Sequence, residues 1–212
     1  MRATEFITEA TRPPPIEVAM RDKGYKLLGS GVEQTAYLAP DGTVLKLFPS
    51  NWDNKLSKNQ LSFIEFANYC QAHPDNPFLP QFEGWEKFNY DDTLYLQIKS
   101  ERLFPFNSNA GLMLDRIATM TKNNSIEQVI DAISNYSTNL TYGGNVDDKD
   151  SRLSEVVTLL GGKEELILFV KTIKDLAEIA KRKRYKLDLH RENFMLGSDG
   201  HIVINDPFFA GD

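Results

Sequence analysis

Apolar residues in the first half of the chain fall into short runs separated by turn-forming residues. Three such runs follow one another between residues 24 and 48, broken by a Gly-Ser-Gly segment at 29–31 and by Asp-Gly at 41–42. Two more, FEGWEKF and TLYLQI, follow a proline-rich connection at residues 73–80. Short apolar runs bounded by glycine and Asp-Gly are typical of antiparallel strands. The pattern up to about residue 103 therefore predicts a five-stranded antiparallel sheet.

Helical segments are predicted within this sheet and after it. Residues 56–72 contain neither glycine nor proline, which suits a helix inserted between the third and fourth strands. The longest helix is predicted from about Lys163 to Arg182, where apolar residues recur at steps of three and four. Shorter helices are predicted at 126–133 and 153–160, on either side of a polar loop that contains glycine. The predicted fold class is therefore α+β, with a sheet region followed by a mainly helical one.

The two ends of the chain differ in character. The first 23 residues combine a short amphipathic piece with three consecutive prolines, Pro13 to Pro15, which forbid a helix and favour an extended arm. We expect this segment to form an arm or a short helix outside the core. The last residues contain two short β-like runs, NFML and HIVIN, around a Ser-Asp-Gly turn at 198–200. This pattern predicts a short hairpin near the C-terminal end.

Composition narrows the class of protein. Hydrophobic residues make up 41% of the chain and charged residues 25%, which is the balance of a soluble globular protein. The net charge of −6 and the pI near 5.2 argue against a general nucleic-acid or acidic-membrane binder. A single cysteine, Cys70, excludes an internal disulfide framework, and no apolar run reaches 18 residues. We expect a cytoplasmic protein without a membrane or nucleic-acid partner.

Candidate chemistry first appears in the predicted sheet. The glycines at 29–31 lie between two strand-like runs, where backbone amides can approach an anion without a side chain in the way. A Gly-x-Gly segment in a hairpin is also compatible with a plain turn. Lys46 lies inside the apolar strand at residues 44–48. Its side chain is predicted either to point to solvent or to provide a fixed cation facing phosphate oxygens.

The segment LDLHRENFML at residues 187–196 carries the strongest motif. Asp188 and Asn193 are five residues apart, and Asp206 follows Asn193 by thirteen residues, with the predicted hairpin between them. Two oxygen ligands brought together by a hairpin suit a hard divalent cation, and the remaining carboxylate can accept a proton from a hydroxyl. The alternative is a solvated loop with scattered acids, against which the spacing and the strand context argue.

The order of these motifs resembles that of protein-kinase-like phosphotransferases, the group that includes aminoglycoside phosphotransferases and the protein kinases of some tailed phages. Residues 29–36 stand where the loop G-x-G-x-x-G-x-V is expected, residues 43–46 stand where V-A-I-K is expected, and residues 188–193 match D-L-x-x-x-N. The resemblance covers residues 24–209. It implies a bilobal fold with an N-terminal arm (1–23), a five-stranded N-lobe with one helix (24–103) and a truncated, mainly helical C-lobe (104–212).

The resemblance also implies a role for each candidate residue. Lys46, held by Glu65 of the predicted helix, would contact the α- and β-phosphates of ATP, and Asp188 would take the proton of the acceptor hydroxyl. Asn193 and Asp206 would hold Mg²⁺. The residues that would contact the nucleotide are Gly29, Ser30, Gly31, Val32 and Ala36 of the loop, Lys46 of the strand, and Ser100 and Glu101 at the hinge between the lobes.

The chain departs from the family pattern at three places. Gln34 replaces the third glycine of the loop, which adds bulk near the expected phosphates. Lys186 and Leu187 precede Asp188, so the arginine that would answer a phosphorylated activation loop is absent. Pro207 follows Asp206 and restricts its backbone, which argues against a flipping switch. His190 within the motif is expected to be a structural hydrogen-bonding residue rather than a metal ligand or base.

The predicted function is Mg²⁺- and ATP-dependent phosphotransfer to a protein serine or threonine hydroxyl, in a minimal architecture of the phage type. The alternatives are a kinase of a small hydroxylated or aminated molecule, such as an aminoglycoside or choline, and a non-catalytic nucleotide-binding module. Asp206 lies six residues before the last residue, Asp212. We therefore expect acceptor recognition to come from residues 108–162, from the N-terminal arm or from a partner chain that completes the C-lobe. The expected location is the cytoplasm, that of the host if the protein is phage-encoded.

Overall fold

The computed structural model describes residues 15–31, 33–50, 55–106, 110–124, 128–129, 158 and 160–210. The main sheet is built from β1 (Lys26–Ser30), β2 (Thr35–Leu38), β3 (Val44–Pro49), β4 (Phe82–Tyr90) and β5 (Thr93–Ser100). The described helices are α1 (Pro15–Asp22), α2 (Lys58–Ala72), α3 (Ala110–Asn123) and α6 (Lys163–Lys183), with a short 3₁₀ turn η1 (Arg191–Asn193). Further short strands are β6 (Phe104–Pro105), β7 (Lys186–Leu187), β8 (Phe194–Leu196), β9 (Ile202–Ile204) and β10 (Phe208–Phe209). The fold is α+β, as predicted.

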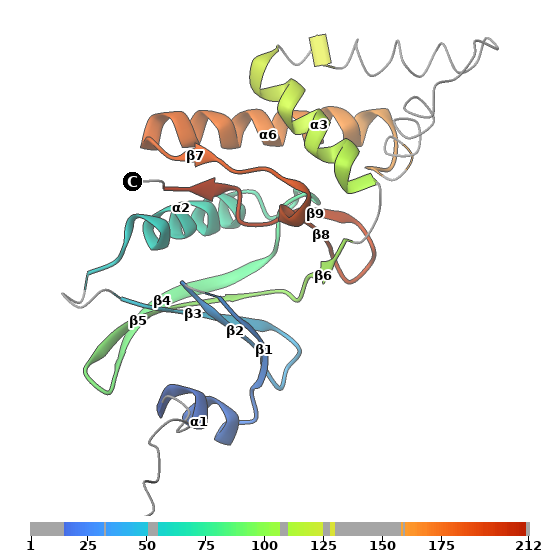
Figure 1. Cartoon of the computed structure of the whole chain (residues 1–212). Coiled ribbons are helices and arrows are strands. Elements are labelled where there is room, and N and C mark those ends of the chain that lie inside the picture. Colours follow the sequence, from blue (N-terminus) through green and yellow to red (C-terminus); the bar gives the residue numbers. More distant parts are fainter. Residues whose placement is uncertain are drawn as a thin grey trace, which may run out of the picture.

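The five predicted strands form one antiparallel sheet in the order β1-β2-β3-β5-β4. This confirms the five-stranded antiparallel sheet. Figure 1 shows α1 on one side of the sheet, α2 on the other, and α6 and α3 stacked beyond α2. The strands β7 and β10 lie between α2 and α6 in this view (Figure 1).

Strand β3 sends alternate side chains to the two faces of the sheet. Leu45 and Leu47 are buried with Met20 of α1 in one cluster. Phe48 is buried with Phe63 of α2 in another. The same alternation places Lys46 on the α2 side. Any chemistry in which Lys46 takes part therefore lies on the face of the sheet that α2 covers.

Helix α1 confirms the short helix that was one expectation for the N-terminal segment and corrects its expected place outside the core. It begins at Pro15, and proline is tolerated at the first helical position because its missing N–H would have no partner there. Met20 is only 6% exposed and packs in the cluster with Tyr37 and Leu45. The part of the segment at residues 15–22 is therefore a helix that contributes to the core. Residues 1–14 lie outside the described part of the chain.

The first turn of helix α2 is stabilised by hydrogen bonds between Ser57 and Gln60. Ser57 accepts a hydrogen bond from the backbone N–H of Gln60, and the Gln60 side chain accepts one from the Ser57 N–H. This reciprocal pair is a capping box. The helix ends at Ala72, and its C-cap residue His73 immediately precedes Pro74. The prediction of a helix over residues 56–72 is confirmed.

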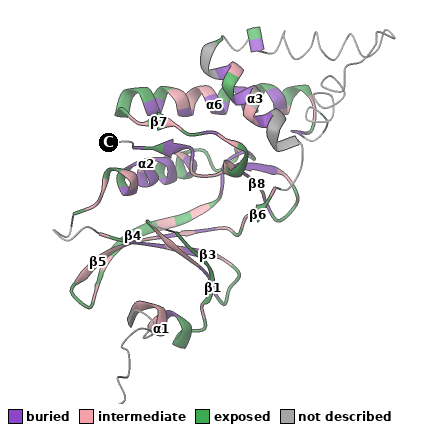
Figure 2. Cartoon of the chain, in the orientation of Figure 1, coloured by how far each residue is buried: buried purple, intermediate pink, exposed green. Residues whose placement is uncertain are grey.

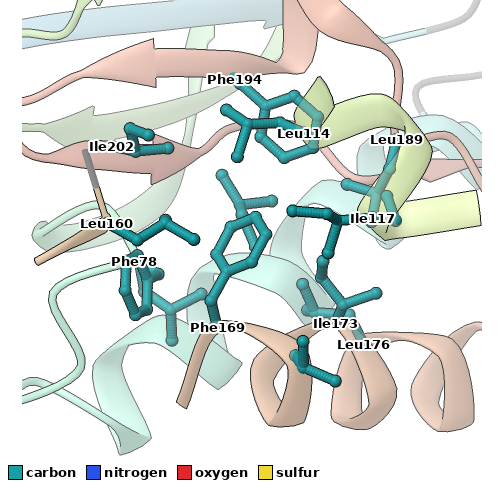
Figure 3. Packing of buried hydrophobic residues seen from close by; sticks show 14 of the residues in the cluster. Phe78, Leu114, Ile117, Leu160, Phe169, Ile173, Leu176, Leu189, Phe194 and Ile202 are labelled. Atoms are coloured by element: carbon teal, nitrogen blue, oxygen red, sulfur yellow. The ribbon is translucent and has the colours of Figure 1, made fainter. Parts of the chain in front are cut away.

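The largest core lies between α6, α3 and the C-terminal strands. Figure 3 shows Phe169, Ile173 and Leu176 of α6 pointing toward Ile117 of α3 and toward Phe194 of β8. All of these side chains are fully or almost fully buried. The burial map repeats the pattern, because one stripe of α6 is buried and the opposite side is exposed (Figure 2). The helix predicted from about 163 to 182 is confirmed.

Two other sequence expectations concern the region between α3 and α6. The helices predicted at 126–133 and 153–160 lie outside the described residues, apart from 128, 129, 158 and 160. Within that described part, Val129 and Leu160 are buried in the large core. Helix α3 lies at 110–123, where no specific helix was predicted.

The C-terminal hairpin forms as predicted from NFML and HIVIN. Strand β8 pairs with β9, with Phe194 opposite Ile204, and β6 pairs with β8 on its other side. Both Phe194 and Ile204 are buried in the large core. The hairpin is therefore anchored to the core through its own side chains. Among the described helices, none is long and apolar enough to cross a membrane.

A pair of isoleucines on α6 tests this packing. Ile173 is fully buried and Ile167 is 39% exposed on the same helix. We expect Ile173→Ala to lower the free energy of unfolding by about 2–5 kcal/mol, because it leaves a cavity in the core. Ile167→Ala should change it by only about 0.5 kcal/mol. Urea denaturation followed by circular dichroism measures both values, and equal losses in the two variants would contradict the described orientation of α6.

Candidate functional site

Asp188, Asn193 and Asp206 lie on the wall of one cavity, which has a volume of about 200 Å³. The glycine-rich loop contributes Glu33 and Gln34 to the lining of the same cavity. The structure therefore brings together the three polar residues that the sequence motif singled out. They come from two segments that are joined by the β8–β9 hairpin.

Backbone hydrogen bonds hold these two segments side by side. Strand β7 pairs with β10, with Leu187 opposite Phe208. The N–H of Asp188 donates to the carbonyl oxygen of Pro207 at 2.8 Å. At the base of the β8–β9 hairpin, the N–H of Asn205 donates to the carbonyl oxygen of Asn193 at 2.7 Å. The separation of the two carboxylates is thus fixed by the main chain.

The side chain of Asn193 also joins these two segments. Its Nδ2 donates to the carbonyl oxygen of Asp188 at 2.6 Å and to that of Asp206 at 3.2 Å. Two carbonyl acceptors determine which end of the amide carries the nitrogen. The amide oxygen Oδ1 is left to act as an acceptor or a metal ligand.

Asp206 has an unusual backbone conformation. Its φ is +49°, in the left-handed region that few residues other than glycine adopt. The following Pro207 restricts the residue before it further. Backbone strain of this kind costs about 1–3 kcal/mol and persists where the surroundings hold it in place. Here the Asn193 amide and the β7–β10 pairing hold both sides of Asp206.

Burial raises the pKa of the Asp206 carboxyl, because the charged form loses hydration. Lys46 opposes this effect, and the nearby carboxylates of Asp188 and Glu33 add to it. A buried carboxylate among other acids is an environment in which a cation is stabilising.

No group of three or more His, Cys, Asp or Glu side chains within the described residues is arranged to hold a metal ion. Asp206 and Asn193, the two residues that the sequence motif suggests as metal ligands, are oxygen donors on the wall of this cavity. Two such ligands suit a cation that is shared with phosphate oxygens.

Lys46 is held as a fixed cation on the α2 side of the sheet. Its strand is paired on both sides, with Lys46 opposite Ala36 of β2 and Ile98 of β5. The ammonium lies 3.4 Å from Oδ1 of Asn205 and 4.6 Å from the centre of the Phe63 ring. Burial lowers the pKa of Lys46, and Asp206 opposes that shift. An ammonium over an aromatic face is a cation–π contact.

The expected ion pair between Lys46 and Glu65 is not formed. Glu65 instead pairs with Lys183 at the end of α6, at 2.9 Å. The reason is the rotation of α2, because residues two apart in a helix point about 200° away from each other. Phe63 faces Lys46, so Glu65 faces α6. The assignment of Glu65 as a partner of Lys46 is corrected.

The glycine-rich loop leads into β2, and β2 pairs with β3, the strand that contains Lys46. Ala36 lies directly opposite Lys46, and Ser30 Oγ is within hydrogen-bond distance of Thr35 Oγ1 at 3.2 Å. The N–H of Gly31 donates to the carbonyl oxygen of Gln34 at 2.8 Å, which closes the turn. A side chain at Gly29 would meet no atom within 4 Å, so the space next to it is open. Val32 lies outside the described residues.

The proposed hinge residues lie at the end of β5. Ser100 is buried between Val44 and Phe82, with which it pairs. Glu101 donates its backbone N–H to the carbonyl oxygen of Gln81, and its Oε1 accepts the N–H of Gln81. Neither residue lines the cavity of Asp188 and Asp206. Their role as a hinge stays a prediction.

Two residues of α2 that the sequence analysis missed face the site. Asn59 and Phe63 line the cavity and lie one helical turn apart. Asn59 donates from Nδ2 to Glu33 Oε1 at 2.6 Å and accepts the N–H of Ala210 at Oδ1 at 2.9 Å. The spacing of four was visible in the sequence, but nothing in it showed which face of the helix meets the sheet.

No protein-family profile matches this sequence, and no curated protein does. Among solved structures, the chain is similar to APH(2'')-IIa in its ternary complex with streptomycin and ATP. That similarity covers 95% of this chain and 74% of the other, at 15% sequence identity and a TM-score of 0.33.

A double-mutant cycle tests the corrected pairing of Glu65. For Glu65→Gln and Lys183→Met we expect a coupling free energy of roughly 0.2–1 kcal/mol, because the pair is partly exposed to solvent. The same cycle with Glu65→Gln and Lys46→Met should give a coupling near zero. Both are measured from free energies of unfolding in urea. A larger coupling with Lys46 than with Lys183 would restore the pairing expected from the sequence.

Proposed function

We propose that this protein is a Mg²⁺-dependent phosphotransferase that moves the terminal phosphoryl group of ATP to a hydroxyl. The observation that supports it most directly is the convergence of Asp188, Asn193 and Asp206 on one cavity, with Lys46 fixed beside Asn205. Phosphoryl transfer depends on placing the acceptor in line and on neutralising charge on phosphate oxygens. The site contains groups suited to both tasks.

Asp188 is the group proposed to act on the acceptor. Its side chain is 49% exposed, so a hydroxyl can reach it from solvent. The hydroxyl oxygen would form a bond to the terminal phosphorus while the bond to the ADP oxygen breaks, and the hydroxyl proton would pass to the Asp188 carboxylate. His190 Nε2 lies 3.7 Å from Asp188 Oδ2, and its Nδ1 accepts the N–H of Glu192. This arrangement orients the imidazole toward Asp188.

Lys46 is proposed to neutralise phosphate charge. Its ammonium is held by the Phe63 ring and by Asn205, and no carboxylate forms a close ion pair with it among the described residues. A lysine without a close paired acid can pair with an anionic ligand, and the bound anion would oppose the effect of burial on the Lys46 pKa. The strand pairing with Ala36 keeps this charge next to the glycine-rich loop.

Asp206 and Asn193 are proposed to hold Mg²⁺. The buried Asp206 carboxylate and the amide oxygen of Asn193 are hard oxygen donors, which suits this cation. When bound, the cation neutralises charge on the phosphate oxygens. Asn193 contributes in a second way, because its amide nitrogen ties the Asp188 segment to the Asp206 segment.

For the acceptor, we propose a protein serine or threonine hydroxyl in a minimal kinase of the phage type. Asp188 and the 46% exposed Phe209 border the same cavity, which leaves room for a hydroxyl carried on a large molecule. A hydroxyl on a small aminated molecule is the second candidate. It is favoured by the three carboxylates that line the cavity, Glu33, Asp188 and Asp206.

The proposal includes a bilobal arrangement, with the nucleotide between residues 24–103 and residues 104–212. We also propose that the protein acts in the cytoplasm and that a partner chain completes the acceptor side of the site. The glycine-rich loop and the hinge at Ser100 and Glu101 would contact the nucleotide.

The central test is transfer of label from γ-labelled ATP in the presence of Mg²⁺. A cell lysate and a panel of small hydroxylated amines are offered as acceptors side by side. We expect Asp188→Asn to reduce labelling at least about 100-fold, because the acceptor proton loses its base. Asp199→Asn is the matched control, since Asp199 lies in the exposed turn between β8 and β9.

Equal labelling by wild type and Asp188→Asn would overturn the catalytic assignment. Label in protein bands supports the first acceptor class, and label in the amine panel supports the second. No transfer by a protein that binds nucleotide would point to the non-catalytic module.

A thermal shift tests the metal site separately. We expect ATP with Mg²⁺ to raise the melting temperature, because a ligand that binds only the folded state stabilises it. Asp206→Asn should lose the part of the shift that depends on Mg²⁺. An unchanged Mg²⁺ dependence in this variant would show that Asp206 does not hold the metal.

A further inference from the structure

Asn59 of α2 connects two segments that are far apart in the sequence. Its Nδ2 donates to Glu33 Oε1 of the glycine-rich loop at 2.6 Å, across 26 residues of sequence. Its Oδ1 accepts the N–H of Ala210 at 2.9 Å, across 151 residues. One amide side chain thus uses both ends to join the loop, the helix and the end of the C-terminal strand β10. A helix residue with these contacts can set the position of the loop.

The loop position fixed by Asn59 brings a third carboxylate to the site. Glu33 lines the same cavity as Asp188 and Asp206, and His190 is the one other ionisable residue among the described residues that line it. The cavity therefore carries an excess of negative charge. The Oε1 of Gln34, which lines the cavity too, is buried without a hydrogen-bond partner among the described residues. Both features favour a cation and disfavour a bare anion.

We propose that Asn59 is a positioning residue that fixes the Glu33 carboxylate over the site, and that this fixed charge makes the site select a metal-complexed triphosphate over the free triphosphate. The inference rests on the proposed function. Like charges repel, and complexation with Mg²⁺ removes two of the negative charges that a triphosphate brings toward Glu33. Glu33 therefore acts as a specificity residue for the metal complex.

The specificity is tested by the dissociation constants of ATP with Mg²⁺ and of ATP with EDTA, measured by calorimetry. Glu33→Gln keeps an oxygen that can accept from Asn59 but removes the charge. We expect it to strengthen binding of free ATP about 10-fold and to change binding of the Mg²⁺ complex less than about 3-fold. Equal changes for the two forms would overturn the selective role of Glu33.

The positioning role is tested without nucleotide by hydrogen exchange of the free protein. Asn59→Ala should speed exchange at Ala210 and in the loop at residues 31–34, because both contacts are lost. Asn59→Asp keeps an acceptor for Ala210 but puts a like charge against Glu33. We therefore expect this variant to protect Ala210 and release the loop. Unchanged loop exchange in both variants would contradict the proposal.

Asn68→Ala provides the matched control on the same helix. Asn68 is exposed and accepts a hydrogen bond from Trp85 Nε1, away from the cavity. It should change neither the loop exchange nor the ratio of the two dissociation constants. In Asn59→Ala the dissociation constant of free ATP, divided by that of the Mg²⁺ complex, should fall, as it should in Glu33→Gln. An effect of Asn59→Ala on stability alone would leave this ratio unchanged.

The binding and hydrogen-exchange experiments together distinguish failure of this inference from failure of the proposed function. If the wild type binds neither form of ATP, the proposed function fails and the selective role of Glu33 fails with it, while hydrogen exchange still decides the role of Asn59. If the wild type binds the Mg²⁺ complex and Glu33→Gln does not bind free ATP more tightly, the proposed function stands and the selective role of Glu33 is wrong.

Discussion

The amide of Asn193 is the contact on which the site depends. Its nitrogen is bonded to the carbonyl oxygens of Asp188 and Asp206, so a single side chain fixes the two carboxylate-bearing segments relative to each other. The contact is firm because its neighbours are anchored in the core. Phe194 and Ile204 are buried, and the Ile204 N–H donates to the carbonyl oxygen of Phe78 at 2.9 Å. The large helical core therefore supports the site directly, through the hairpin that carries Asn193.

The rotation of α2 is the second constraint. Most of its buried residues are apolar, and burying Phe63 and Phe66 against the sheet and the C-terminal strands fixes that rotation. Once Phe63 is buried, Asn59 must face the site one turn earlier and Glu65 must face α6. Hydrophobic packing thus decides which polar residue of the helix meets the site. The aromatic ring under Lys46 follows from the same packing.

This explains what the sequence could and could not predict. Strand runs, the long helix and the C-terminal hairpin were predictable, because each is set by local periodicity and turn residues. The triad of Asp188, Asn193 and Asp206 was predictable because a short hairpin brings its members together. The partner of Glu65 was not, since it depends on how α2 and α6 pack across more than a hundred residues. The role of Asn59 was hidden for the same reason, as both its partners are distant in sequence.

Asp206 combines three features that each disfavour the folded state in isolation. Its backbone is left-handed before a proline, its carboxylate is buried, and two other acids lie near it. Lys46 relieves only part of this, because its ammonium is also desolvated. A cation bound at Asp206 would offset the remaining repulsion, and the Glu33 carboxylate would increase that gain. The same arrangement that disfavours the site without a ligand would therefore favour a bound cation, which links the strain at Asp206 to the loop held by Asn59.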